Sequence, residues 1–186
     1  MNKKRIWLVL PMALLPYLVL FALATIFFSA ELPFFTFIME QIFGSNAWAL
    51  IGALFLYCVL AGLISAICFA VSVYKRWDAL SLAKCAMVVK LIQVPAYTVI
   101  FVLGVLFFTT VFTFPFTVGL FLFDCFSLVL SGLLLLASAI NAVREGLTEK
   151  KTALLFVLLQ VVFCVDVIAS VVFYLRMKRA SGNREE

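Results

Sequence analysis

The stretch LLQVVFCVDVIASVVFY, residues Leu158–Tyr174, places a carboxylate inside an apolar run. Asp166 is its one charged residue, and Gln160 and Ser170 are polar residues within two helical turns of it. An ionisable side chain in the interior of a bilayer is costly, so it is the default place to look for function. The question is therefore why a chain that avoids charge in its apolar runs places a carboxylate in the last of them, and what Asp166 faces there.

The composition of the whole chain is that of a membrane protein. Its 186 residues are 67% hydrophobic and 12% charged, and the mean hydropathy is +1.24. A soluble domain is nearer half apolar and about a quarter charged, so these residues do not provide a water-soluble surface. Apolar runs of ~18 residues or more favour helices over a β-barrel. We therefore expect an all-α integral membrane protein with a single transmembrane domain over residues 1–186.

Five segments satisfy the requirement of about 20 apolar residues for one span, so the sequence predicts a five-transmembrane-helix bundle. Between the first two spans, ELPFFTFIMEQIFG (residues 31–44) is too short to cross, and its apolar, aromatic character predicts a short interfacial helix. A re-entrant loop is the alternative there. The turn REGLTEKK (residues 144–151) is so short that the last two spans are expected to form an antiparallel hairpin. The expected spans are 6–30, 47–73, 85–108, 115–143 and 152–175.

Positive charges in short loops predict the orientation of the chain. They lie at the N-terminus and in the second and fourth loops, whereas the first and third loops have none. The N-terminus is therefore predicted to be cytoplasmic, with the first span retained rather than cleaved. Five spans then place the C-terminus outside, which conflicts with the four positive charges of the tail LRMKRASGNREE (residues 175–186). The loop charges are Lys3, Lys4, Arg5, Lys75, Arg76, Lys84, Arg144, Lys150 and Lys151.

Three ionisable residues lie inside the apolar runs, namely Lys90, Asp124 and Asp166. Lys90, Gln93 and Tyr97 share one face of the third span, where Lys90 is expected to snorkel to the headgroups, with a carboxylate contact inside the bundle as the alternative. Asp124 begins a polar stripe along one face of the fourth span. Such a stripe faces protein or water, so it is interpreted as a helix–helix interface or as one wall of a polar pathway. The stripe consists of Asp124, Ser127, Ser131, Ser138 and Asn141.

The two acids are predicted to lie at similar depth. Counted from the turn at Leu147, Asp124 and Asp166 differ by four residues, roughly 6 Å of helix rise. Two facing carboxylates in a low dielectric do not both stay ionised cheaply, which is the chemistry of a proton or cation site. Lys90 differs from Asp124 by about 18 Å in depth and is not expected to be the counter-ion. The competing interpretation is two separate acids, each neutralised by protonation or satisfied by Ser127, Ser170 or Gln160. The candidate residues are Asp124, Asp166, Ser127, Ser131 and Gln160.

The sequence has no recognisable catalytic or metal-binding motif. It has no histidine, and its five cysteines contain no CxxC pair and are interpreted as packing residues. The patterns GxSxG, HExxH, GxGxxG and the P-loop are absent. We therefore expect no enzyme activity, no metal and no cofactor. Nucleic acid is not an expected partner either, because the basic residues lie in short loops between apolar runs.

The segment NAVREGLTEKKTALLFVLLQVVFCVDVIAS, residues 141–170, contains an Arg-Glu-Gly turn and a Leu-Gln-x-x-Phe-Cys-x-Asp-Val-Ile run. It resembles an uncharacterised family of small multi-span membrane proteins from low-GC Gram-positive bacteria. The resemblance covers about the last 30 to 50 residues and implies a bacterial plasma membrane protein of unknown function. It implies no role for Asp166.

Two functions are consistent with these observations. The first is a small transport-related or accessory membrane component with a proton or cation site, working in the lipid bilayer as a homo-oligomer or with a membrane-protein partner. The alternative is a non-transporting interaction, immunity or regulatory subunit that packs against another membrane protein. The intramembrane carboxylates distinguish them, because transport requires these groups for flux and an interaction role requires them only for stability or partner binding.

Overall fold

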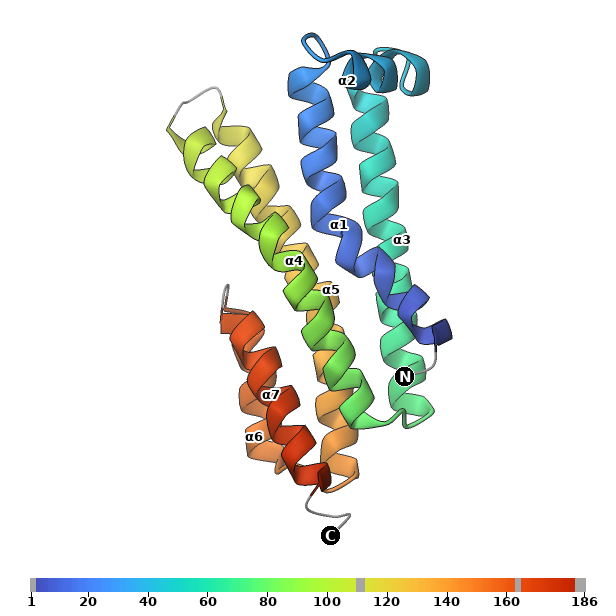
Figure 1. Cartoon of the computed structure of the whole chain (residues 1–186), viewed down its shortest axis with the longest axis vertical. Helices are drawn as coiled ribbons and strands as arrows, with labels where there is room; N and C mark the ends of the chain where they lie inside the picture. Colours follow the sequence, from blue (N-terminus) through green and yellow to red (C-terminus); the bar gives the residue numbers. More distant parts are fainter. Residues whose placement is uncertain (1–2, 110–112, 163–164, 183–186) are drawn as a thin grey trace.

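The computed structural model describes residues 3–109, 113–162 and 165–182, and the regular elements in these ranges are helices (Figure 1). Four of the described helices are long and apolar enough to cross a membrane. This confirms the all-helical prediction and supports a membrane location. The end points differ by a few residues from the first four predicted spans. The four helices are α1 (Lys3–Phe28), α3 (Ala47–Tyr74), α4 (Ala79–Phe108) and α5 (Phe114–Arg144).

Local sequence signals account for where these helices begin. Asn46 precedes α3, and its Oδ1 accepts a hydrogen bond from the backbone N–H of Trp48 at 2.9 Å. Asp78 precedes α4, and its Oδ2 accepts from the N–H of Ser81 at 2.8 Å. Each cap satisfies an N–H group that the first helical turn leaves without a partner. Pro115 lies in the first turn of α5, where the missing N–H of proline costs nothing.

A short helical segment joins α1 to α3 where the sequence predicts an interfacial helix. It consists of α2 (Pro33–Phe37) and one π-helical turn (Ile38–Ile42). The segment lies across the same end of α1 and α3 (Figure 1). Phe34 and Phe37 are exposed, as expected for aromatic side chains that enter the headgroup region. The helix is thereby confirmed, and its position in the headgroup region stays a prediction.

The predicted fifth span, 152–175, is not a single helix. The helix α6 (Lys150–Leu159) ends after 10 residues, and α7 (Val165–Gly182) runs back beside it (Figure 1). Ten residues rise about 15 Å, roughly half of a ~30 Å hydrocarbon core. The predicted single helix over 152–175 is therefore replaced by two shorter helices, and the count of five spans is not confirmed.

Side-chain contacts show that α6 and α7 form an antiparallel hairpin. The rings of Phe156 on α6 and Phe173 on α7 pack with centroids 5.3 Å apart. One turn further along α6, the Nε2 of Gln160 donates to the Oγ of Ser170 at 3.2 Å. Residue numbers increase along one helix while they decrease along the other, which is the register of antiparallel neighbours. The predicted hairpin after the 144–151 turn also exists, since α6 packs against α5.

The hairpin returns basic residues to the end of the bundle that carries the other positive charges. Arg176, Lys178 and Arg179 lie on the last turns of α7, close to the end of α5 and the start of α6 (Figure 1). The α3–α4 turn lies at this end too, and α1 begins toward it. Arg184 lies outside the described residues. The prediction that the C-terminus lies outside depended on a continuous fifth span, which the structure does not have.

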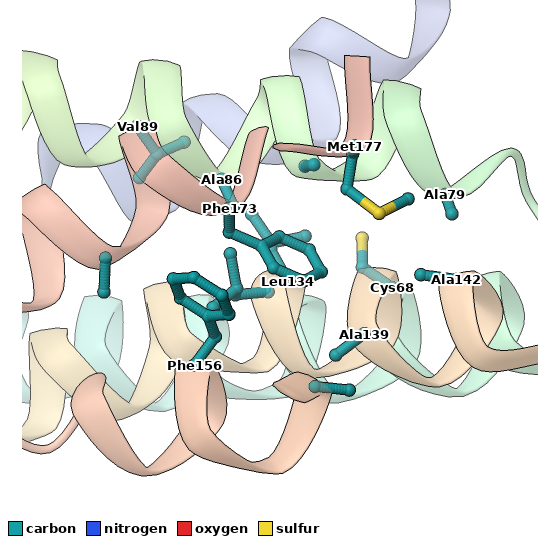
Figure 2. Close-up of a cluster of buried hydrophobic side chains, with 14 of the residues drawn as sticks. Cys68, Ala79, Ala86, Val89, Leu134, Ala139, Ala142, Phe156, Phe173 and Met177 are labelled. Atoms are coloured by element: carbon teal, nitrogen blue, oxygen red, sulfur yellow. The ribbon is translucent and has the colours of Figure 1, made fainter. Parts of the chain in front are cut away.

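Small side chains bring the hairpin close to α4. Ala79, Ala83 and Ala86 recur at about one-turn spacing on α4, and all three are fully buried. Phe173 and Met177 of α7 belong to the same buried cluster (Figure 2). Small residues let neighbouring helix backbones approach closely, which increases van der Waals contact where lipid supplies no hydrophobic drive. The hairpin is therefore an integral part of the core.

Candidate functional site

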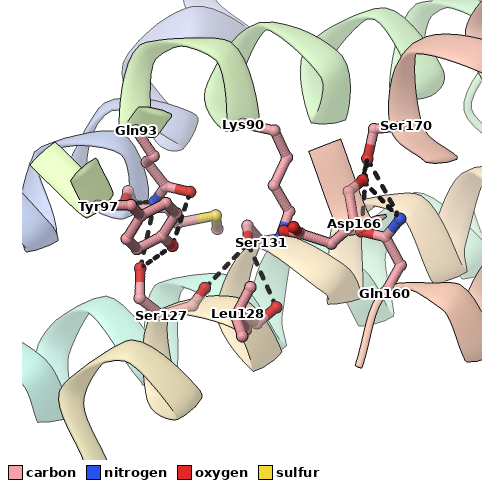
Figure 3. A network of polar contacts seen from close by, with 10 residues as sticks. Lys90, Gln93, Tyr97, Ser127, Leu128, Ser131, Gln160, Asp166 and Ser170 are labelled. Carbon is pink, nitrogen blue, oxygen red and sulfur yellow. Dashed lines mark hydrogen bonds and ion pairs between the residues drawn. The ribbon is translucent and has the colours of Figure 1, made fainter. Parts of the chain in front are cut away.

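A buried ion pair joins α4 to the tip of the hairpin. The Nζ of Lys90 donates a hydrogen bond to Oδ2 of Asp166, and the two side chains are 0% and 2% exposed (Figure 3). Each charge compensates the other far from water, whereas either one alone would be very costly to bury. The pair therefore fastens the first turn of α7 to α4, about 17 Å along that helix from its start.

Lys90 is the partner of Asp166, contrary to the prediction from sequence. Counting along a continuous helix from Leu147 placed Asp166 near the depth of Asp124. Because α6 ends at Leu159 and α7 turns back, Asp166 lies instead at the level of Lys90. The prediction that Lys90 snorkels to the headgroups is wrong, and its alternative, a carboxylate contact inside the bundle, is confirmed.

Two polar neighbours hold the start of α7. The Nε2 of Gln160 donates to the backbone oxygen of Asp166 at 3.1 Å, and the Oγ of Ser170 donates to the same oxygen at 2.8 Å. Asp166 lies in the first turn of α7, where its negative charge also meets the positive end of the helix dipole. In a bilayer, polar groups of this kind need partners from the protein itself. Gln160 and Ser170 thus stabilise the tip of the α6–α7 hairpin.

A second hydrogen-bonded cluster lies beside the ion pair and joins three helices (Figure 3). The Nε2 of Gln93 on α4 donates to the backbone oxygen of Met12 on α1 at 2.8 Å and to the Oγ of Ser127 on α5 at 3.3 Å. The hydroxyl of Tyr97 lies 2.8 Å from that Oγ and donates to Oε1 of Gln93 at 3.1 Å. The Met12 carbonyl is available because Pro16, four residues later, has no N–H. A proline in α1 therefore creates the acceptor that holds Gln93.

The C-terminal members of the polar stripe on α5, Ser138 and Asn141, form hydrogen bonds with the α3–α4 turn. The Oγ of Ser138 donates to the backbone oxygen of Ala79 at 2.7 Å. The Nδ2 of Asn141 donates to the carbonyls of Ser72 and Trp77 at 3.0 and 2.8 Å. These bonds satisfy backbone groups at the end of α3 and the start of α4. Here the stripe acts as a helix–helix interface, which is one of the two interpretations of the sequence pattern.

Asp124 and Ser131 differ from the other predicted site residues. The Oγ of Ser131 donates to the backbone oxygen of Ser127 at 2.9 Å, within α5. Asp124 is half-buried, and within the described ranges it has no hydrogen bond or ion pair. The predicted facing pair of Asp124 and Asp166 is therefore wrong, because Asp166 is matched by Lys90 and Asp124 has no described partner.

Asp124 lines a groove of about 280 Å³ between α4 and α5. The groove is otherwise mainly apolar and open, since Phe101 and Phe121 in its walls are 60% and 65% exposed. Phe101 and Phe108 follow Lys90 by about three and five helical turns, so they share its face of α4. The hairpin covers this face up to the level of Lys90, and the groove is the uncovered continuation. To find this groove from the sequence, one would need to know both which residues share the face of Lys90 on α4 and where the last apolar run breaks.

Comparisons with known proteins identify no relative. No family model, no curated protein and no solved structure matches the chain. The resemblance of residues 141–170 to small bacterial membrane proteins stays a prediction. In the part of the chain that the structure describes, no three His, Cys, Asp or Glu side chains come together as a metal site requires.

Tyr97→Phe is expected to lower the free energy of unfolding by about 1 kcal/mol, because the hydroxyl bonds both Gln93 and Ser127. Denaturant titration in mixed micelles measures this loss. Tyr74→Phe is the matched control, since Tyr74 is 87% exposed and should lose nothing. Strict additivity of Tyr97→Phe and Ser127→Ala in a double-mutant cycle would contradict the contact.

Proposed function

We propose that the chain is an accessory subunit of a membrane-protein complex, with four spans, a re-entrant C-terminal hairpin and both ends in the cytoplasm. The orientation is supported by the positive-inside rule. Basic residues of the α3–α4 turn, the start of α6 and the end of α7 fall at one end of the bundle. The segments 29–46 and 109–113 at the other end contain no Lys or Arg. The family resemblance favours the plasma membrane of a bacterium.

The observation that carries this function is the carboxylate of Asp124 in an apolar groove. Asp124 lies ten residues, about 15 Å, from the start of α5, which is deep within a span. An acid at such depth is costly unless a partner compensates it. The intramembrane cation of this chain, Lys90, is already paired with Asp166. The cation for Asp124 is therefore supplied from outside the chain.

A transmembrane helix with a Lys or Arg near its middle is the occupant that fits. The amine of a lipid headgroup stays at the interface, far from the depth of Asp124. A second copy of this chain offers no free cation at that depth, because Lys90 is enclosed. Gly104 in the groove has open space where a side chain would be, so a helix can approach closely there. These features favour a different protein over a second copy.

Asp124→Asn is expected to abolish binding of this helix, because it removes the charge and keeps the size of the side chain. A photocrosslinking residue at Phe121, in the groove, should give one protein adduct in native membranes, and Asp124→Asn should reduce its yield at least tenfold. The crosslinked peptide should carry an intramembrane Lys or Arg. Exchanging that residue for Asp, together with Asp124→Lys, should restore the adduct.

A crosslinking residue at Ile67 is the matched control, since Ile67 is 61% exposed, close to the 65% of Phe121, but lies on α3. It should give no adduct that depends on Asp124. Adducts with lipid alone at Phe121, unchanged in Asp124→Asn, would contradict the proposal.

Proton or cation movement is the second candidate function, and one observation favours it. Lys90, Gln93, Ser127 and Asp124 lie one helical turn apart in succession on α4 and α5, joined by the bond from Gln93 to Ser127. Such a chain of polar groups is typical of proton relays. The purified protein in liposomes distinguishes the two functions. Proton or cation flux that is lost in Asp124→Asn would favour transport. If the chain is an accessory subunit, we expect no flux.

A further inference from the structure

A hollow of about 670 Å³ opens where α3 ends and turns into α4. It lies at the basic end of the bundle, beside the last turn of α5. Its lining combines two arginines with one face of α3. The lining residues are Phe69, Ala70, Val73, Tyr74, Arg76 and Arg144.

The two arginines line this hollow, and neither is paired with an acid among the described residues. The Nη1 of Arg144 donates to the backbone oxygen of Val73 at 2.8 Å, which fixes its guanidinium against the end of α3. Arg76 has φ +48°, a left-handed conformation that is uncommon for a residue with a side chain. Neither forms an ion pair with a described carboxylate. The nearby Glu145 already accepts a hydrogen bond from the N–H of Ala79 at 3.2 Å. Both guanidinium groups therefore retain donors for an anion.

The remaining walls match an amphiphile rather than a free ion. Phe69, Ala70 and Val73 extend along the last turns of α3, from the headgroup end toward the bilayer interior. Tyr74, the last residue of α3, is exposed, as aromatic residues at the membrane interface commonly are. Arginine binds phosphate oxygens through two parallel N–H groups, and basic hollows on this side of a membrane suit acidic headgroups.

We propose that this hollow binds an anionic phospholipid, with the phosphate between Arg76 and Arg144 and an acyl chain along α3. The site is separate from the Asp124 groove and does not depend on the function proposed for it. A bound lipid would bridge the end of α3 to the end of α5. It would reinforce the contact that Arg144 makes with Val73 and so stabilise the turn into α4.

Native mass spectrometry of the full chain with phosphatidylglycerol and phosphatidylcholine tests the proposal. The wild type should retain phosphatidylglycerol preferentially. Arg76→Gln with Arg144→Gln should weaken its binding at least tenfold more than the control Lys84→Gln with Lys178→Gln. The control removes the same charge from exposed positions outside the hollow. Equal losses in the two double variants would overturn the proposal in favour of diffuse attraction.

A second variant separates loss of the site from loss of folding. Ala70 is exposed, so Ala70→Trp fills the apolar wall without changing the charge and should also reduce phosphatidylglycerol binding at least tenfold. Unchanged binding in this variant would overturn the proposal. Competition by millimolar inorganic phosphate tests the other source of the same chemistry. Complete displacement of the lipid by inorganic phosphate would assign the arginines to a soluble anion instead.

Discussion

Asp166→Ala is expected to lower the free energy of unfolding by about 3–5 kcal/mol, because it leaves the charge of Lys90 buried without compensation. The loss should be measurable by denaturant titration in mixed micelles. It should be accompanied by faster proteolysis in the α6–α7 segment, since the pair fastens the hairpin tip to α4. Lys84→Gln is the control on the same helix. Lys84 is exposed, so its loss should be within about 0.5 kcal/mol of zero.

The double variant Lys90→Met with Asp166→Leu shows whether the two charges act as a pair. Replacing both charges by apolar side chains of similar size removes the uncompensated group, so this variant should recover most of the stability lost in Asp166→Ala. Lys90→Met alone should be destabilised, because the carboxylate of Asp166 then has no cation. Single losses that simply add in the double variant would show that the ion pair does not form.

A reporter fused to the C-terminus is expected to lie on the same side of the membrane as one fused to the N-terminus. The effect is all-or-none, since four crossings return the chain to its starting side and five do not. The physical reason is that α6 is too short to cross and α7 returns beside it. Reporters that are active on only one side of the membrane give the measurement. A reporter fused after Thr109, at the far end of α4, should give the opposite result.

Cysteine labelling tests the depth of the hairpin in a variant without the native cysteines. An impermeant reagent on the cytoplasmic side should label Ser181→Cys and should not label Val161→Cys at the hairpin tip. Labelling of Val161→Cys from the outside, together with a C-terminal reporter on that side, would restore the five-span arrangement.

Much of the fold was predictable because it depends on local properties. Span length and hydropathy are properties of a single segment, so α1, α3, α4 and α5 are recognisable one at a time. The caps at Asn46 and Asp78 involve atoms two or three residues away. The small-residue faces that pack α4 and the hairpin follow from helical spacing alone.

The partners of the polar residues were not predictable in the same way. The sequence identified Lys90, Gln93, Ser127 and Asp166 as functional or structural candidates, and each of them is buried in a polar contact. Which acid meets Lys90 depends on where the last apolar run breaks. The positive charges of the C-terminal tail conflicted with a fifth crossing, and this was the signal that the run turns back.

The sequence by itself predicted a helical membrane protein with five spans, of which the structure has four as long apolar helices, and it marked the positions where charge enters the apolar interior. Only the tertiary structure decided that Leu158–Tyr174 folds back, because a crossing helix and a re-entrant hairpin have similar apolar composition. The difference lies in whether the polar groups near the break, above all the carboxylate of Asp166, find partners inside the protein. Lys90, 76 residues earlier in the chain, pairs with this carboxylate, and Gln160 at the tip bonds the backbone oxygen of Asp166.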